Sequence, residues 1–221
     1  MKAIVIGASR GLGLEFVRQY RAQGWAVTAT ARGAEGLALL KALGAQAIEL
    51  DVSSAESVSR LPWQVEGIGF DVAIYNAGVY GPRTNAMDAP GTDEFDAVMH
   101  TNVLGAMRVL GALQGSLAEG AKLAVISSRM GSIGARTSNS GWLYRASKAA
   151  LNSVLADTAI ALQGRAACVA FHPGWVRTDM GGAGADLTPE QSVASICRVI
   201  AHLQPEDNGH FFDHDGSSIP W

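Results

Sequence analysis

The feature that most constrains this chain is a regular alternation of short apolar runs with segments of helical periodicity. The run Lys2–Ile6 is followed by a glycine-rich stretch, 7–13, and then by apolar residues spaced as on one face of a helix out to Gln23. The same order recurs along the chain. Strands that alternate with helices form parallel sheets, and strands that are apolar throughout are buried on both faces. The pattern therefore predicts an α/β fold with one doubly wound, mostly parallel sheet and helices on both faces.

The predicted elements follow one another without a linker or an internal repeat. Strands are expected at 2–6, 26–30, 47–50, 70–75, 122–126, 167–171 and 210–213. Helices are expected from the glycine stretch to 23, and at 34–43, about 53–65, 92–113, 142–162 and 189–203, the last capped by Thr188. The chain has 221 residues, 48% of them hydrophobic, which is enough for one sizeable core. We expect a single Rossmann-type domain spanning residues 1–221.

The composition disfavours several kinds of partner. A formal net charge of -3 without a run of like charges offers no electrostatic footprint for nucleic acid or an anionic membrane surface. The N-terminal apolar run is too short for a signal peptide, and no stretch of about 18 apolar residues could span a bilayer. Cys168 and Cys197 lie in apolar runs, which favours buried thiols in a reducing compartment. We expect a cytoplasmic protein that binds neither nucleic acid nor membranes.

A nucleotide site is predicted at the carboxyl ends of the strands, where ligands bind in doubly wound sheets. The Gly7-x-x-x-Gly11-x-Gly13 loop follows the first strand, so its backbone N–H groups and the next helix could hold a pyrophosphate. Ala31-Arg32 follows the second predicted strand, at the place where sites that prefer NAD carry an acidic residue. With Arg10 as a second guanidinium, this site is suited to a 2′-phosphate, and the predicted cofactor is NADP(H).

Tyr144 and Lys148 are four residues apart on a predicted helix and therefore project from the same face. A nearby ammonium stabilises a phenolate and lowers the pKa of the phenol, which would allow Tyr144 to act as a general acid or base. The same spacing also fits a partly buried aromatic residue beside a surface lysine whose stem covers apolar area. The spacing alone leaves both interpretations open.

Taken together, the motifs resemble those of the short-chain dehydrogenase/reductase family. They are, in the family's order, the glycine loop, Asp51-Val52, Asn76-Ala77-Gly78, Asn102, Ser128, Tyr144-x-x-x-Lys148 and Pro173-Gly174. The resemblance covers essentially the whole chain. The phrases around Ser128 and Tyr144 and the ending Asp215-Gly-Ser-Ser-Ile-Pro-Trp are similar to those of the C-factor and sniffer branch of carbonyl reductase-like members.

The resemblance implies a catalytic set of Asn102, Ser128, Tyr144 and Lys148. Tyr144 would exchange a proton with the substrate oxygen while hydride moves to or from nicotinamide, and Lys148 would lower its pKa and hold the ribose hydroxyls. Ser128 would orient the reacting oxygen, and Asn102 would hold a water that connects Lys148 to solvent. From the residues alone, Ser128 could equally be a turn residue and Asn102 a helix residue with a local backbone bond.

The choice of serine departs from the family's usual spacing of about 13 residues before the tyrosine. Ser128 precedes Tyr144 by 16 residues and Ser132 precedes it by 12. We predict Ser128, because it ends a strand and the extra length then enlarges the loop 129–141. Ser127 should point to the opposite side of the strand.

The implied cofactor contacts lie at successive strand ends. They are Gly7, Ser9, Arg10, Gly11, Leu12, Gly13, Arg32, Asp51, Val52, Asn76, Ala77, Gly78, Tyr144, Lys148, Pro173, Gly174, Val176 and Thr178. Asp51 and Val52 would lie near the adenine and Thr178 near the carboxamide, although Asp51 could instead cap a helix.

The resulting prediction is an NADP(H)-dependent oxidoreductase that reduces a ketone or aldehyde, with an NADP(H)-binding sensor as the alternative. No metal site is expected, because the histidines and cysteines lack zinc-ligand spacing, and a Ser-His-Asp hydrolase fits the sequence poorly. A short lid at 179–186 should leave an open pocket for a small carbonyl or alcohol substrate. The apolar helices 92–113 and 142–162 resemble the family's dimerising pair, which predicts a homodimer or homotetramer.

Overall fold

A computed structural model describes all residues, 1–221, and its centre is a seven-stranded sheet in which every pairing is parallel. The strands are β1 (Lys2–Ile6), β2 (Ala26–Ala31), β3 (Gln46–Glu49), β4 (Phe70–Tyr75), β5 (Leu117–Ile126), β6 (Ala166–His172) and β7 (Phe211–Asp213). Their order in the sheet is β3-β2-β1-β4-β5-β6-β7. The direction of winding reverses between β1 and β4, which makes their carboxyl ends the topological switch point. The predicted doubly wound fold is confirmed.

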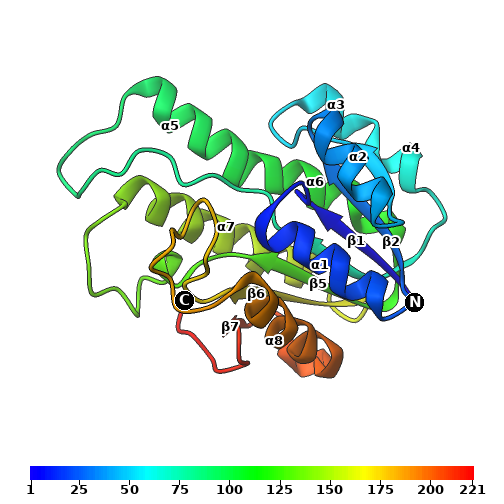
Figure 1. The fold of residues 1–221 in the computed structure, drawn as a ribbon. Coiled ribbons are helices and arrows are strands. Elements are labelled where there is room, and N and C mark those ends of the chain that lie inside the picture. The colour runs from blue at the N-terminus through cyan, green and yellow to red at the C-terminus, as the bar shows by residue number, and fades with distance from the viewer.

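Helices cover both faces of this sheet (Figure 1). They are α1 (Gly11–Ala22), α2 (Ala34–Ala42), α3 (Ala55–Ser59), α4 (Leu61–Val65), α5 (Thr92–Met99), α6 (Gly105–Leu113), α7 (Trp142–Ala161) and α8 (Pro189–His202). Because strand side chains alternate, β1 sends Ile4 and Ile6 into the core under α6 and α7, and Ala3 and Val5 into the core under α1 and α8. None of the helices combines the length and the apolar character that a membrane crossing requires.

Two predicted elements differ in detail from those observed. The helix expected over about 53–65 is broken at Arg60 into α3 and α4, because Pro62 has no N–H to donate and its ring crowds the preceding turn. Ser54 caps α3, since its hydroxyl accepts the N–H of Ser57 at 3.2 Å. The fifth strand begins at Leu117 rather than Lys122, because Glu119 and Gly120 interrupt the apolar run from which its start was predicted.

The helix predicted over 92–113 is continuous but not uniformly α-helical. Between α5 and α6 it contains a π-helical turn, His100–Leu104. Such turns are rare, are usually one turn long and are frequent at functional sites. This one carries Asn102, whose side chain is fully buried.

Candidate active site

A cleft of about 420 Å³ runs along the carboxyl ends of the strands. It is lined by Gly7, Ser9, Arg10, Gly11, Leu12, Ala31, Arg32, Leu50, Val52, Asn76, Ala77, Gly78, Val79, Thr101, Ile126, Ser127, Tyr144, Lys148, Pro173, Arg177, Thr178, Asp179 and Met180. Most of the predicted cofactor contacts are therefore brought together in one continuous cavity at the switch point.

The glycine loop lies so close to neighbouring backbone that side chains would not fit. Gly7 has a φ of +80°, and a Cβ there would lie 2.8 Å from the Cα of Ala77. A Cβ on Gly13 would lie 2.2 Å from the carbonyl oxygen of Gly7, so Gly13 lets α1 start directly against the strand end. The Asn76 side chain donates to that same oxygen at 2.8 Å and holds the loop in place. The result is a rigid cradle of backbone at the amino end of a helix, which suits a phosphate group.

Two arginines, Arg10 and Arg32, line the cleft. Arg32 is exposed, and Arg10 makes an exposed ion pair with Asp179, with Nη1 and Oδ2 2.8 Å apart. Asp51 lies nearby but its carboxylate accepts the N–H and hydroxyl of Ser53, which lowers its pKa together with a smaller effect of Arg32. Asp51 thus accepts hydrogen bonds within the loop before α3 and does not cap that helix, whose cap is Ser54, while Arg10 and Arg32 stay accessible to a phosphate.

Tyr144 and Lys148 lie one turn apart on α7 and both are buried. The Lys148 Nζ atom is 5.7 Å from the centroid of the Tyr144 ring and donates to the carbonyl oxygen of Ile126 at 3.0 Å. Burial lowers the pKa of Lys148 to about 8, and burial raises the pKa of Tyr144. The expected lowering of the Tyr144 pKa by Lys148 is therefore wrong for the protein alone, because burial of the phenol raises its pKa and Lys148 is not among the groups that lower it.

Three serines follow β5, and only Ser128 bears on the phenol. Its hydrogen bonding opposes the rise in the pKa of Tyr144, and its hydroxyl also accepts the Met130 N–H at 3.1 Å. The Ser127 hydroxyl is engaged in a hydrogen bond with Asn152 of α7, although the residue itself lines the cleft, contrary to the expectation that it lies on the opposite side. The Ser132 hydroxyl, fully buried, donates to the carbonyl oxygen of Pro220. This geometry supports the choice of Ser128 over Ser132.

Asn102 lies behind the cleft and joins it to α7. Its Oδ1 accepts the N–H of Val79 at 2.8 Å, and its Nδ2 donates to the carbonyl oxygen of Val79 at 2.8 Å and to Ser147 at 2.9 Å. These bonds reach across the fold, so Asn102 is not making a local helical bond. It fixes the segment that follows β4 against the helix that carries Tyr144 and Lys148.

The surroundings of the Tyr144 hydroxyl were not predicted. The Tyr80 ring is stacked on the Tyr144 ring, with centroids 4.5 Å apart and an interplanar angle of 21°. The guanidinium of Arg83 lies 5.0 Å from the centroid of the Tyr80 ring and donates from Nη2 to the carbonyl oxygen of Met180 at 3.2 Å. The Tyr144 hydroxyl in turn donates to the Met180 sulfur at 3.9 Å. Met180 lies within the lid predicted at 179–186, and Tyr80 and Arg83 lie in the segment that follows β4.

Some predicted residues lie outside the lining of the cleft, namely Gly13, Asp51, Asn102, Ser128, Gly174 and Val176. Val176 is buried and bridges to Leu187 at the base of the lid, so it shapes the cavity from behind. Other lining residues were missed: Ala31, Leu50, Val79, Thr101, Ile126, Ser127 and Arg177. Ala31, Leu50 and Ile126 end strands or directly follow them, so the rule that ligands bind at strand ends could have found them.

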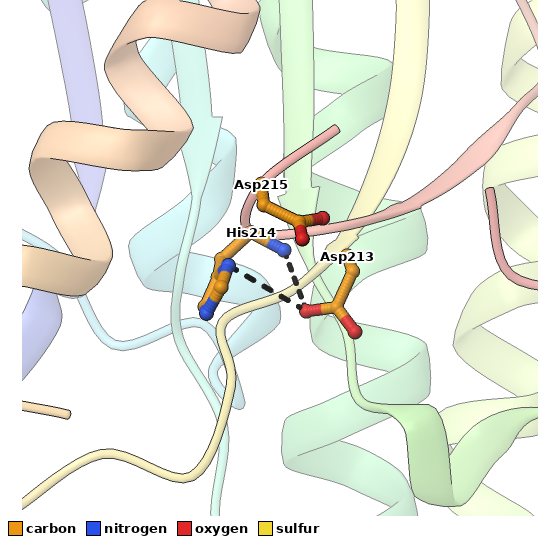
Figure 2. Close-up of side chains that lie close together, drawn as sticks. All are labelled: Asp213, His214 and Asp215. Carbon is orange, nitrogen blue, oxygen red and sulfur yellow. Dashed lines mark hydrogen bonds and ion pairs between the residues drawn. The ribbon is translucent and has the colours of Figure 1, made fainter. Parts of the chain in front are cut away.

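A cluster of Asp213, His214 and Asp215 at the end of β7 has donor atoms within 4.8 Å of one another (Figure 2). Its carboxylates already have partners. Asp213 pairs with Arg129 at 2.7 Å and accepts the backbone N–H of His214, while Asp215 accepts the N–H and hydroxyl of Ser217. The Arg129 pair connects the edge strand to the turn that follows Ser128, so the cluster stabilises the fold beside the site.

Comparisons with known proteins agree with this geometry. The sequence model for the short chain dehydrogenase family matches residues 1–186. C-signal from Myxococcus xanthus is 42% identical over 154 residues, which is 68% of this chain and 92% of that protein. A short-chain dehydrogenase/reductase from Burkholderia multivorans with bound NADP has a TM-score of 0.90 at 33% identity, over 100% of this chain and 99% of the other. The carbonyl reductase Sniffer of D. melanogaster has a TM-score of 0.89 at 28% identity, over 100% and 99%.

Proposed function

This chain belongs to the short-chain dehydrogenase family and is similar to its C-signal and Sniffer members, and from that premise we propose that it is an NADPH-dependent reductase of ketones or aldehydes. The observation that carries the proposal is that Tyr144 lines the same cleft as the glycine loop, one helical turn from Lys148, and directs its hydroxyl to Met180, another residue of that lining. A cavity that joins a phosphate cradle to a buried acid suits a nucleotide-dependent proton and hydride transfer.

The residues of the cleft fit NADP(H). The glycine cradle would hold the pyrophosphate, and Arg10 and Arg32 would bind a 2′-phosphate, for which planar guanidinium groups are well suited. No carboxylate lies at the end of β2, where binding of NAD would require one for the ribose hydroxyl. The related Burkholderia protein binds NADP, which supports the same cofactor here.

In this proposal NADPH, when bound, supplies the hydride for the carbonyl carbon. Tyr144 donates its proton to the carbonyl oxygen, and its raised pKa keeps that proton in place until the oxygen gains negative charge. Ser128 orients the oxygen by a hydrogen bond, and the positive charge of Lys148 stabilises the phenolate that forms. Asn102 positions the segment that carries Val79, so that the wall of the cleft keeps its shape.

The test is the oxidation of NADPH by the purified protein with a panel of aldehydes, ketones and quinones. We expect turnover with some of these carbonyls and a lower Kd for NADPH than for NADH. Tight binding of NADPH with no turnover on any compound would contradict the reductase and favour the sensor. The sensor has one structural argument, because Met180 lies on the hydroxyl that a substrate would need.

We also propose a cytoplasmic homodimer or homotetramer. The helices α5, α6 and α7 expose Phe95, Met107 and Ile160, which are 45%, 53% and 73% accessible. Exposed apolar side chains on neighbouring helices are suited to a two-fold interface. Light scattering should give a mass of at least two chains, and a monomer at working concentration would contradict the proposal.

A further inference from the structure

Met180 makes two polar contacts that a substrate would have to replace. Its sulfur accepts a hydrogen bond from the Tyr144 hydroxyl, and its carbonyl oxygen accepts one from Arg83. An atom that accepts the proton of the catalytic phenol stands where the substrate oxygen must stand during reduction. Met180 therefore occupies part of the substrate position with a segment of the chain itself.

Arg83 is the second point of contact, and it has no acidic partner. It makes no ion pair, and a single hydrogen bond to Met180 uses one of its five N–H donors. The guanidinium carbon lies over the Tyr80 ring, 5.0 Å from its centroid, and this cation–π contact holds the group beside the active site. A planar guanidinium binds a carboxylate through two parallel charge-assisted bonds, which are stronger than its bond to a neutral peptide oxygen. A substrate carboxylate could thus displace the Met180 carbonyl from Arg83.

The covalent structure of Met180 gives the distance between the two contacts. Its carbonyl oxygen and its sulfur are joined through the carbons C, Cα, Cβ and Cγ. In a 4-oxo carboxylate, a carboxylate oxygen and the oxo oxygen are joined through the carboxylate carbon, two methylene carbons and the oxo carbon, which is the same number of bonds. One small molecule of this kind could therefore replace both Met180 acceptors, the carbonyl oxygen that binds Arg83 and the sulfur that binds Tyr144.

We propose that Arg83 determines specificity for carbonyl substrates that bear a carboxylate, and that 4-oxo carboxylates are the class that fits. This inference rests on the proposed reductase function. The substrate enters as Met180 moves aside, its carboxylate binds Arg83 and its oxo oxygen accepts the hydrogen bond of Tyr144. Hydride from NADPH then adds to the oxo carbon, the Tyr144 proton goes to the oxygen, and the products are a 4-hydroxy acid and NADP.

Lid composition is consistent with this exchange. Met180 is 39% exposed and is followed by Gly181, Gly182 and Gly184, and Gly182 has a φ of +79°. Glycine-rich segments change backbone conformation at low cost, and the unbranched methionine side chain has several accessible rotamers. The segment therefore permits Met180 to leave the phenol without disturbing the sheet.

The experiment compares 4-oxopentanoate with its neutral amide, 4-oxopentanamide, in steady-state NADPH oxidation. For the wild type, kcat/KM should favour the acid by about tenfold or more, mainly through KM, because charge-assisted hydrogen bonds are the stronger ones. In Arg83→Gln this ratio should fall to near one, and in Arg83→Lys, which keeps the charge but not the fork, it should be intermediate. A control, Arg136→Gln, removes an exposed charge from a neighbouring loop and should retain the wild-type ratio.

A chain-length series completes the test. Activity should be highest with 4-oxopentanoate and lower with 3-oxobutanoate and 6-oxoheptanoate. Equal kcat/KM for acid and amide in the wild type, or an equal loss for both in Arg83→Gln, would overturn the inference and leave Arg83 as a support for Tyr80. In that case the neutral carbonyls would still be reduced. If no carbonyl of any kind is reduced, the proposed function itself fails.

Discussion

The Tyr80 ring is stacked on the Tyr144 ring at a centroid distance of 4.5 Å, and this stack requires a glycine at position 141. A Cβ on Gly141 would lie 2.4 Å from the Tyr80 hydroxyl oxygen, and the φ of +65° at Gly141 also disfavours other residues. The start of α7 at Gly141 and the loop after β4 that carries Tyr80 thus together fix the orientation of the Tyr144 ring.

The stack predicts a positioning role for Tyr80. Tyr80→Ala should lower kcat by about tenfold, because a catalytic group that is free to move loses its favourable orientation. Tyr80→Phe keeps the ring and should recover most of that loss. Steady-state kinetics of the two variants measures the difference, and an equal loss in both would assign the effect to the hydroxyl instead of the stack.

Tyr144→Phe tests the proton transfer itself. General acid catalysis contributes about 10²–10⁴-fold, so kcat should fall by that amount while NADPH still binds. Tyr20→Phe is a matched control, because Tyr20 is also buried and its hydroxyl has no hydrogen-bond partner, but it lies in the core under α1. Equal rates for the wild type and Tyr144→Phe would remove Tyr144 from the mechanism.

Lys148 should cost stability at neutral pH, because burial lowers its pKa from 10.5 to about 8. Below pH 8 the Lys148 amine is charged in both the folded and the unfolded state, and its burial then destabilises the folded protein. Between pH 8 and 10.5 the unfolded state binds more protons at Lys148 than the folded state does, so the free energy of unfolding of the wild type rises with pH in this range. Lys148→Met has no buried amine, so it should unfold at a higher temperature than the wild type at pH 7. The difference between the two unfolding temperatures should be smaller at pH 9.5. Thermal unfolding at the two pH values checks this. An advantage that stays constant with pH would show that the amine is not desolvated.

The Arg10–Asp179 ion pair should oppose the binding of NADPH, since the carboxylate competes with a 2′-phosphate for one guanidinium. Exposed pairs are worth about 0.2–1 kcal/mol, so Asp179→Asn should lower the Kd for NADPH by up to about fivefold and leave that for NADH unchanged. Arg10→Ala combined with Arg32→Ala should weaken NADPH far more than NADH.

Fluorescence titration of both cofactors gives these constants. Glu56→Gln is the control, because it removes the carboxylate from a similar exposed pair with Arg60, away from the cleft. A Kd for NADH equal to or below that for NADPH would refute the roles given to Arg10 and Arg32.

The sheet and the order of the site residues could be predicted because they depend on local patterns. Most strands are predominantly apolar, and the carboxyl-end rule then places the glycine loop, Arg32 and Asn76 at the same end of the sheet. The start of β5 was missed because the segment from Leu117 to Lys122 contains Glu119 and Gly120, which break the apolar run.

The remaining features depend on contacts between residues far apart in the chain. Ser132 has a turn-like sequence context, and only its partners, Pro220 and Trp221, show that it holds the C-terminal segment. From the sequence, we predicted that the charge of Lys148 lowers the pKa of Tyr144. In the fold, burial of the phenol has the largest effect on this pKa, and the spacing of the two residues in the sequence does not show how deeply the phenol is buried. The contact between Met180 and Tyr144 likewise depends on how the lid folds back.

The π-helical turn at His100–Leu104 has a consequence for comparing this chain with its relatives. A π-turn contains one more residue than the α-helical turn it replaces, so in evolutionary terms it is a single-residue insertion within a helix. Deleting one residue there would restore a regular helix and keep Ala106, Val109 and Leu113 facing the core, but it would rotate Asn102 away from Val79. A gap at this point in an alignment would therefore indicate a protein that keeps the fold and has lost this support of its cofactor cleft.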